Sequence, residues 1–137
     1  MSLFISKSEK ETLKYAAQFA QSLKQGDIVA LHGTLGTGKT VFSKGIIQAL
    51  CHTNTDVPSP TFTIVQSYDS EKGTLYHFDF YRLKNPEEAY EIGIEDAFTD
   101  GICLIEWPDK IGTLLPKKHI NVFLSIQDNM HCIQMED

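Results

Sequence analysis

The amino-acid sequence predicts an α/β fold in which helices flank a mixed, mainly parallel central sheet. Two short apolar runs rich in branched residues, 27–32 and 101–106, are typical of buried parallel strands. Apolar residues at helical spacing lie on both sides of the first run, and strand-like segments at 64–69 and 74–80 indicate an antiparallel hairpin. Of the 137 residues, 42% are hydrophobic, so we expect residues 1–137 to form one domain with a substantial core.

The N-terminal residues predict an edge strand followed by a helix. Residues 3–5 are a short apolar run that can add such a strand. Ser6 and Ser8 each have a glutamate three positions on, so either serine can open the helix through a capping box. Apolar residues at helical spacing continue to Leu23, and we expect residues 25–27 to end the helix and turn into the next strand.

Residues 33–40, Gly-Thr-Leu-Gly-Thr-Gly-Lys-Thr, fit the phosphate-loop pattern G-x-x-x-x-G-K-[ST] at every fixed position. The motif stands between the predicted strand 27–32 and a predicted helix that runs from Val41 to Leu50, which is the context that the motif requires. Its glycines allow backbone N–H groups to come close to a β-phosphate. The sequence therefore predicts a P-loop NTPase fold.

The residue types of this loop indicate how it holds a ligand. Lys39 can reach between the β- and γ-phosphates, and the Thr40 hydroxyl is placed to bind Mg²⁺. The start of the helix adds unpaired N–H groups and the positive end of the helix dipole. We expect a nucleoside triphosphate to bind here with magnesium. The residues expected to contact it are Leu35, Gly36, Thr37, Gly38, Lys39 and Thr40.

The segment after this helix predicts a polar connection, a stiff loop and the hairpin. Residues 51–56 are polar, and two prolines in 57–63 exclude a helix and favour an extended segment. Ser59 and Thr61 lie where the switch loop of a nucleotidase would lie, so they are candidates for sensing the γ-phosphate. Residues 70–73 are expected to join the two hairpin strands.

The second half of the chain predicts short helices and a terminal pair of strands. Residues 86–92 are expected to form a short helix with a proline in its first turn, and the acidic segment 87–100 to be a solvated face. Residues 109–115 indicate a short helix or turn. Alternating apolar and polar residues at 119–127 predict a strand, with which 131–135 can pair across a turn.

Two carboxylates stand near the ends of predicted strands. Glu106 follows four apolar residues, as a Walker-B acid does, and Asp79 lies near the end of the strand 74–80. Ligands of open α/β sheets bind at the carboxyl ends of the strands, so both acids are candidates for a metal or water role. Each acid could instead cap a helix or pair with a lysine.

Three residues near these acids each have two interpretations. His77 shares a strand face with Asp79, so it either makes a hydrogen bond near the site or is a structural histidine. Arg82, the only arginine in the chain, either stabilises γ-phosphate charge or holds the acidic helix that follows it. For Trp107 we expect a core position or a contact with a partner.

Charge and cysteine content exclude several classes of protein. A net charge of −6 disfavours direct, tight binding to tRNA or a duplex. The three cysteines are widely spaced with no C-x-x-C pair, which disfavours a disulfide framework and a zinc site. No signal-peptide pattern stands at the N-terminus and no apolar run approaches the roughly 20 residues of a membrane span, so we expect a cytoplasmic protein with no membrane partner.

Four sequence blocks resemble, in order and spacing, the TsaE (YjeE) family of small bacterial ATPases. The blocks are the phosphate loop 33–40, Ser-Pro-Thr-Phe at 59–62, His-x-Asp-x-Tyr-Arg at 77–82 and Leu-Ile-Glu-Trp at 104–107. The resemblance extends from about Leu3 to about Leu124, and no family motif is evident after Ser125. Thr37 stands where alanine is commoner in the family, a small departure for a residue expected to contribute mainly its backbone.

The resemblance implies a role in making threonylcarbamoyladenosine in tRNA. Such a protein hydrolyses ATP with Mg²⁺ and acts on a complex of TsaD and TsaB homologues, which performs the transfer and holds the tRNA, so that contact with tRNA is indirect. By position in the motifs, Lys39, Asp79 and Glu106 would be catalytic, Thr40 would bind phosphate and Mg²⁺, and Thr61 would belong to the switch-like loop. Which acid contacts the metal and which positions water stays open.

Two alternatives use the same loop. A small-molecule kinase would need several lid arginines and an acceptor pocket, whereas this chain has a single arginine. A nucleotide-gated binding module would bind a partner according to its nucleotide without turnover.

Overall fold

The computed structural model describes residues 2–52, 57–58 and 64–136. Predictions for residues 53–56 and 59–63, including the candidate switch residues Ser59 and Thr61, lie outside the described residues. The elements are β1 (Ser2–Ser6), α1 (Glu9–Ala20), β2 (Ile28–His32), α2 (Lys39–Cys51), β3 (Val65–Ser70), β4 (Gly73–Asp79), α3 (Glu88–Glu91), α4 (Ile94–Asp100), β5 (Ile102–Glu106), the 3₁₀ helix η1 (Pro108–Leu114), β6 (Ile120–Gln127) and β7 (Met130–Glu136).

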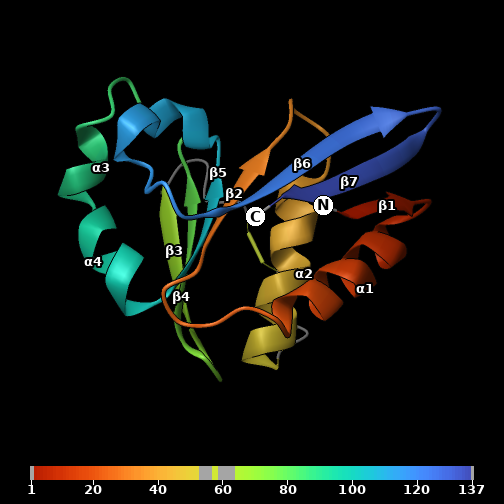
Figure 1. Ribbon diagram of the computed structural model, residues 1–137, viewed down its shortest axis with the longest axis horizontal. Helices are drawn as coiled ribbons and strands as arrows, with labels where there is room; N and C mark the ends of the chain where they lie inside the picture. Colours follow the sequence, from red (N-terminus) through yellow and green to blue (C-terminus); the bar gives the residue numbers. More distant parts are fainter. Residues whose placement is uncertain (1, 53–56, 59–63, 137) are drawn as a thin grey trace.

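The described strands form one seven-stranded sheet in the order β1-β7-β6-β2-β5-β4-β3 (Figure 1). The four central neighbours β6, β2, β5 and β4 are parallel, while β3 and β7 run antiparallel to the strands beside them. The predicted α/β class with a mixed, mainly parallel sheet is therefore confirmed. Among the antiparallel pairs of the described sheet, β3–β4 and β6–β7 are the two hairpins that the sequence indicates, and β1–β7 is the third pair.

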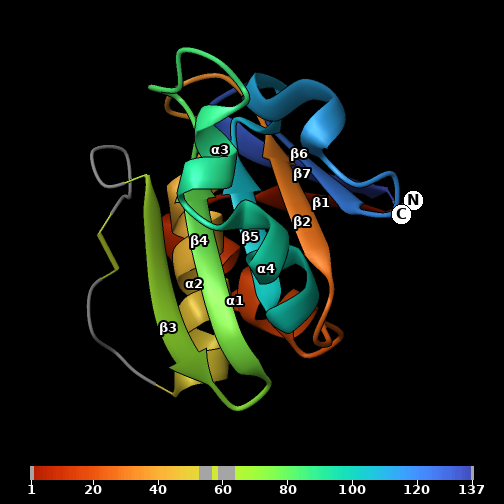
Figure 2. The ribbon, with the colours of Figure 1, turned by 90° about the vertical axis from the view of Figure 1, so that its left-hand side faces the viewer.

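Helices cover the two faces of this sheet with separate apolar clusters. α1 and α2 pack on one face, over a core that includes Phe42, Ile46 and Leu104. α3, α4 and η1 lie on the other face, over Phe78 and Ile105 (Figures 1 and 2). All five residues of β5 are buried because this strand is covered on both faces, which explains its continuous apolar run.

At the N-terminus the structure selects Ser8 as the residue that opens α1. The Ser8 hydroxyl accepts a hydrogen bond from the backbone N–H of Glu11 at 3.1 Å, and the Glu11 carboxylate accepts one from the N–H of Lys7 at 3.0 Å. The Ser6 hydroxyl instead lies 2.6 Å from that of Thr12, inside the fold. This contact joins β1 to the first turns of α1.

One helix prediction needs correction, and one helix was not predicted. α1 ends at Ala20 rather than reaching Leu23, because the next residues tighten into a turn, although Leu23 remains a core residue. The acidic segment forms a second helix, α4, which sequence alone does not separate from a solvated face. Ile94 and Ala97 anchor α4 in the core while its acidic side chains stay exposed.

The remaining elements lie within a few residues of their predicted positions. Asp128 and Asn129 form the turn between β6 and β7, both with the positive φ that a tight hairpin requires. Met130 begins β7, whose residues pair with β6 on one side and with β1 on the other. In the described part of the chain, no helix combines the length and apolar character needed to cross a membrane.

Candidate nucleotide site

The phosphate loop connects the end of β2 to the first turn of α2. Gly36 and Gly38 have φ values of 80° and 100°, a conformation that is strained for residues with side chains. Gly38 is the N-cap of α2, and no side chain among the described residues caps this helix end. The free amide groups of the first turn are therefore available to an anionic ligand.

The loop is held both from within and by strand β7. The Thr37 hydroxyl donates a hydrogen bond to the Thr34 carbonyl at 2.8 Å, so the Thr37 side chain contributes as well as its backbone. The Thr37 carbonyl lies 3.0 Å from Nδ1 of His131. A carbonyl only accepts, so Nδ1 of His131 carries the hydrogen and donates it. The C-terminal hairpin thus fixes the shape of the loop.

Lys39 lies folded back onto the loop that carries it. Its ammonium group donates to the carbonyls of Gly33 and Thr34, the second at 3.4 Å, and the side chain is only 6% exposed. The same ammonium lies 3.7 Å from the centroid of the Trp107 ring, a cation–π contact. Trp107 is half-buried at the site, a position more specific than the core or partner contact expected from sequence.

Strand pairing brings the two candidate acids together beside this lysine. Asp79 and Glu106 are register partners at the ends of β4 and β5, and they are 4% and 3% exposed. Burial lowers the pKa of Lys39, and the negative charges of Glu106 and Asp79 partly oppose that shift. The three ionisable groups thus share one enclosed environment.

Glu106 is the acid in contact with the phosphate loop. The Thr40 hydroxyl is 3.2 Å from each oxygen of its carboxylate. His77, two residues before Asp79 on β4, places Nε2 2.6 Å from Oε2 of Glu106. Asp79 Oδ1 accepts a hydrogen bond from the backbone N–H of Tyr81 at 3.0 Å, which holds the turn after β4.

These groups line a pocket of about 540 Å³ at the carboxyl edge of the parallel strands. Its wall also includes Glu9 and Thr12 of α1 and His131 of β7, which the sequence analysis did not assign to a site. No local motif marks them, since α1 reaches the pocket by packing on α2 and His131 reaches it through the pairing of β7 with β6. The full lining is Glu9, Thr12, Leu35, Gly36, Thr37, Gly38, Lys39, Thr40, Val41, Asp79, Tyr81, Glu106, Trp107 and His131.

The donor atoms of this pocket fit Mg²⁺ brought by a nucleotide. The described residues contain no cluster of three or more histidine, cysteine, aspartate or glutamate side chains that could hold a metal ion by themselves. Thr40 and Glu106 supply hard oxygen donors from adjacent positions. Mg²⁺ generally takes one or two protein oxygens together with phosphate oxygens and water, and this pair matches that requirement.

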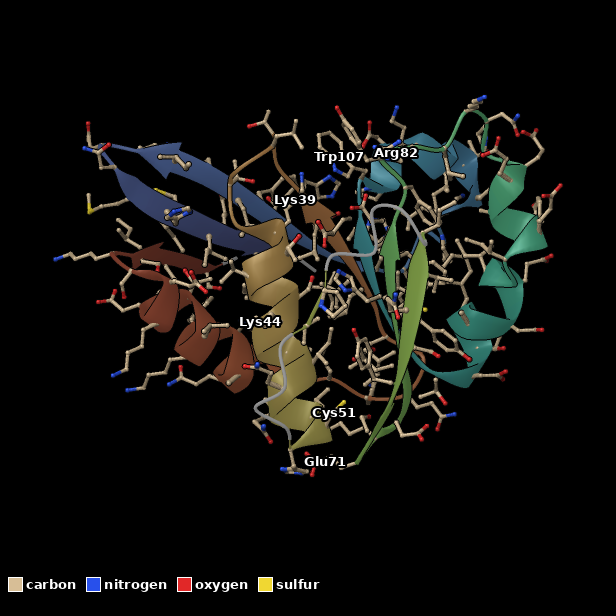
Figure 3. The ribbon with its side chains drawn as sticks, turned by 180° about the vertical axis from the view of Figure 1, so that it is seen from behind. Lys39, Lys44, Cys51, Glu71, Arg82 and Trp107 are labelled. Carbon is tan, nitrogen blue, oxygen red and sulfur yellow. The ribbon has the colours of Figure 1, made fainter. Side chains whose placement is uncertain are left out.

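Figure 3 shows Arg82 and Trp107 at the same end of the fold as Lys39, while Cys51 and Glu71 lie at the far end of α2. Arg82 is exposed and has an interaction partner. Its two predicted roles, near the γ-phosphate or on the acidic helix, stay predictions.

Comparison with known proteins agrees with this geometry. The family model "Threonylcarbamoyl adenosine biosynthesis protein TsaE" matches residues 6–133. The tRNA threonylcarbamoyladenosine biosynthesis protein TsaE of Rickettsia typhi is 49% identical over 122 residues, which are 89% of this chain and 85% of that protein. The Haemophilus influenzae protein of the same name is 39% identical over 133 residues, covering 93% and 84%.

A solved structure is also similar. The crystal structure of Bacillus subtilis YdiB has a TM-score of 0.80 at 30% identity and covers 98% of this chain and 83% of that one. The family model extends beyond Ser125, where the sequence alone offers no motif, and so includes the β7 residue that holds the phosphate loop. With a matched family model, close relatives and a shared fold, the chain belongs to the TsaE family.

Proposed function

We propose that this chain is a single-domain ATPase that binds MgATP and supports tRNA threonylcarbamoyladenosine biosynthesis. The proposal rests on the contact between the phosphate loop and an acid at the end of a strand. The Thr40 hydroxyl lies 3.2 Å from both Glu106 oxygens, beside the buried ammonium of Lys39. This is the arrangement that phosphoryl transfer from a triphosphate needs.

Phosphate binding would use groups that are already in place. The amides of residues 35–40 and the uncapped start of α2 face the pocket and favour negative charge. The Lys39 ammonium would exchange its contacts with the Gly33 and Thr34 carbonyls for charged phosphate oxygens, which are stronger acceptors. In the absence of nucleotide, these carbonyls and Trp107 keep the lysine from being an unpaired buried charge.

The contact between Thr40 and Glu106 favours different roles for the two acids. Bound Mg²⁺ would neutralise charge on the transferred phosphoryl group. Thr40 and Glu106 would hold this metal, directly or through water, since they stand together at the loop. Asp79, one strand away and in register, would be the group that orients the attacking water. This assignment separates the two roles that the sequence leaves open.

The far wall of the pocket is where the nucleoside would lie. Phosphates at residues 36–40 leave the remaining volume toward Glu9 and Thr12 of α1 and toward His131. A pocket of about 540 Å³ is within the usual range of about 300–1,000 Å³ for small-molecule sites. Glu9 and His131 offer polar atoms to a base or ribose, whereas the Thr12 hydroxyl is already engaged with Ser6.

Partner proteins would bind the tRNA, because this chain is poorly suited to bind it directly. The names of the relatives refer to tRNA threonylcarbamoyladenosine biosynthesis, while a net charge of −6 disfavours direct binding of tRNA by this subunit. The exposed acidic side chains of α3 and α4, including Glu91, Glu95 and Asp96, suit a basic protein surface. Homologues of TsaB and TsaD are the proposed partners, and contact with tRNA would be indirect.

The test is the rate of MgATP hydrolysis by this protein alone and with the TsaB–TsaD pair from the same source. A slow rate that rises with the pair supports a partner-activated ATPase. A rate indifferent to the pair contradicts the assignment of partners, and transfer of labelled phosphate to a metabolite would support a kinase instead.

A further inference from the structure

His77 is a fully buried polar residue whose ring reaches the site from the inside of the fold. It lies on β4 in register with Leu104, two residues before Glu106 on β5. Its Nε2 is 2.6 Å from Oε2 of Glu106, whereas Nδ1 is buried and has no hydrogen-bond partner among the described residues. Among the described residues, the ring makes its hydrogen bond to Glu106.

The direction of this hydrogen bond follows from its acceptor. A carboxylate oxygen only accepts, so the Nε2 hydrogen of His77 donates to Glu106. This bond gives the buried ring a polar partner and fixes which of its nitrogens faces the acid.

Among the described contacts, this one distinguishes the two oxygens of Glu106. The Thr40 hydroxyl is 3.2 Å from Oε1 and 3.2 Å from Oε2, so it does not select a rotation of the carboxylate. The hydrogen bond from His77 is short and reaches Oε2 alone. Oε2 therefore accepts from both His77 and Thr40, while Oε1 has Thr40 as its hydrogen-bond partner among the described residues and keeps more acceptor capacity.

We propose that His77 is a positioning residue that fixes the carboxylate of Glu106, so that Oε1 is presented to Mg²⁺ or to a water bound to it. The inference rests on the proposed MgATP site. Residues that orient a metal-binding carboxylate by hydrogen bonding change metal affinity or activity by about 10- to 100-fold when they are replaced. A histidine that merely fills the core would change stability and nothing else.

The experiment compares His77→Phe, which keeps an aromatic ring but has no donor, with His77→Gln, which keeps an N–H group. Leu75→Ala is the matched control, because Leu75 is fully buried on the same face of β4 and contacts the core rather than the site. Three quantities are measured for each variant. They are ADP binding by calorimetry across a Mg²⁺ titration, ADP binding in EDTA, and the rate of ATP hydrolysis across the same titration.

For His77→Phe we expect the Mg²⁺ concentration at half-effect to rise about 10-fold or more, with ADP affinity in EDTA within about 2-fold of wild type. His77→Gln should recover part of the loss. Leu75→Ala should lower Tm while leaving the Mg²⁺ dependence unchanged. If His77→Phe does not fold, His77→Met, which also lacks a donor, takes its place.

The failure of this inference is distinguishable from failure of the proposed function. A wild-type Mg²⁺ dependence in His77→Phe, or an equal shift in Leu75→Ala, overturns the positioning role. A wild-type protein that binds Mg²⁺ and ADP without hydrolysing ATP contradicts the proposed ATPase, yet the Mg²⁺ dependence of ADP binding still decides the role of His77.

Discussion

The two faces of the central strands carry different kinds of residue, although residues of one face alternate with residues of the other along the chain. On the face toward α2, β4 presents His77 and Asp79, and β5 presents Glu106, all nearly inaccessible to solvent. On the opposite face, one residue away, Phe78 and Ile105 belong to an apolar cluster. Because strand side chains alternate, one short segment supplies the site and the core that supports it.

This difference indicates where stability and chemistry can be separated by mutation. The apolar face contributes free energy by burial of large side chains, while the polar face holds charges that cost free energy to bury. Replacements on the first face should lower stability, and replacements on the second should lower affinity or turnover.

The largest expected effect is on stability, from Phe78→Ala. This ring is fully buried and packs against Phe80 at 5.3 Å between centroids. We expect the free energy of unfolding to fall by about 3–5 kcal/mol, from lost burial and the cavity left behind. Urea denaturation measures the change. A loss under about 1 kcal/mol would show that the opposite face is not the supporting core.

Next in size is the effect of Glu106→Gln on turnover. The amide keeps a carbonyl to accept from His77 but removes the negative charge beside Thr40. We expect the rate of ATP hydrolysis to fall by about 100- to 1,000-fold, the size seen when a key electrostatic group is lost. Calorimetry at saturating Mg²⁺ should find nucleotide affinity nearly unchanged. Turnover that survives would make Asp79 the essential acid.

Lys39→Ala should have a smaller effect, and on affinity. Hydrogen bonds to charged groups contribute about 1.5–3 kcal/mol, so we expect ATP affinity to fall by about 10- to 100-fold. Leu35→Ala is the control in the same loop, because that side chain is 68% exposed and its backbone is retained. Equal affinities for the Lys39 variant and wild type in calorimetry would contradict the phosphate-loop assignment.

The smallest effect is a pH dependence of stability that comes from Lys39. Burial lowers its pKa in the folded protein below the ordinary value of 10.5, so between those two pKa values the unfolded chain binds more protons. The free energy of unfolding, taken as wild type minus Lys39→Met, should therefore rise with pH across that window. Urea denaturation at a series of pH values up to about 10.5 measures it. A difference that stays flat or falls would contradict a buried, charged lysine.

Local sequence patterns were sufficient for the parts of this fold that depend on local chemistry. The phosphate loop is predicted by its glycines together with the strand before residue 33 and the helix that follows. The apolar run before Glu106 predicts β5. Asp79 could be placed at a strand end by alternation. In each case, residues adjacent in the sequence were enough to make the prediction.

Contacts between distant segments could not be predicted from local sequence patterns. From the sequence Glu9 is a candidate helix-capping residue, and the packing of its helix on α2 brings it to the pocket. His131 sits in an ordinary alternating strand and gives no sign of the loop that it contacts. The sequence did not predict α4, because its acidic residues outnumber the two apolar residues, Ile94 and Ala97, that anchor it.

The pairing of β1 with β7 also bears on how the protein can be synthesised. Strand β1 stands at the edge of the sheet and enters it through β7, and Glu9 and His131 on the pocket wall are made at widely separated times. A growing chain that has reached β5 already contains the phosphate loop and both acids. It still lacks β7, the strand that anchors both the loop and the first helix. A chain that stops before β7 therefore lacks both the contact from His131 to the phosphate loop and part of the pocket wall.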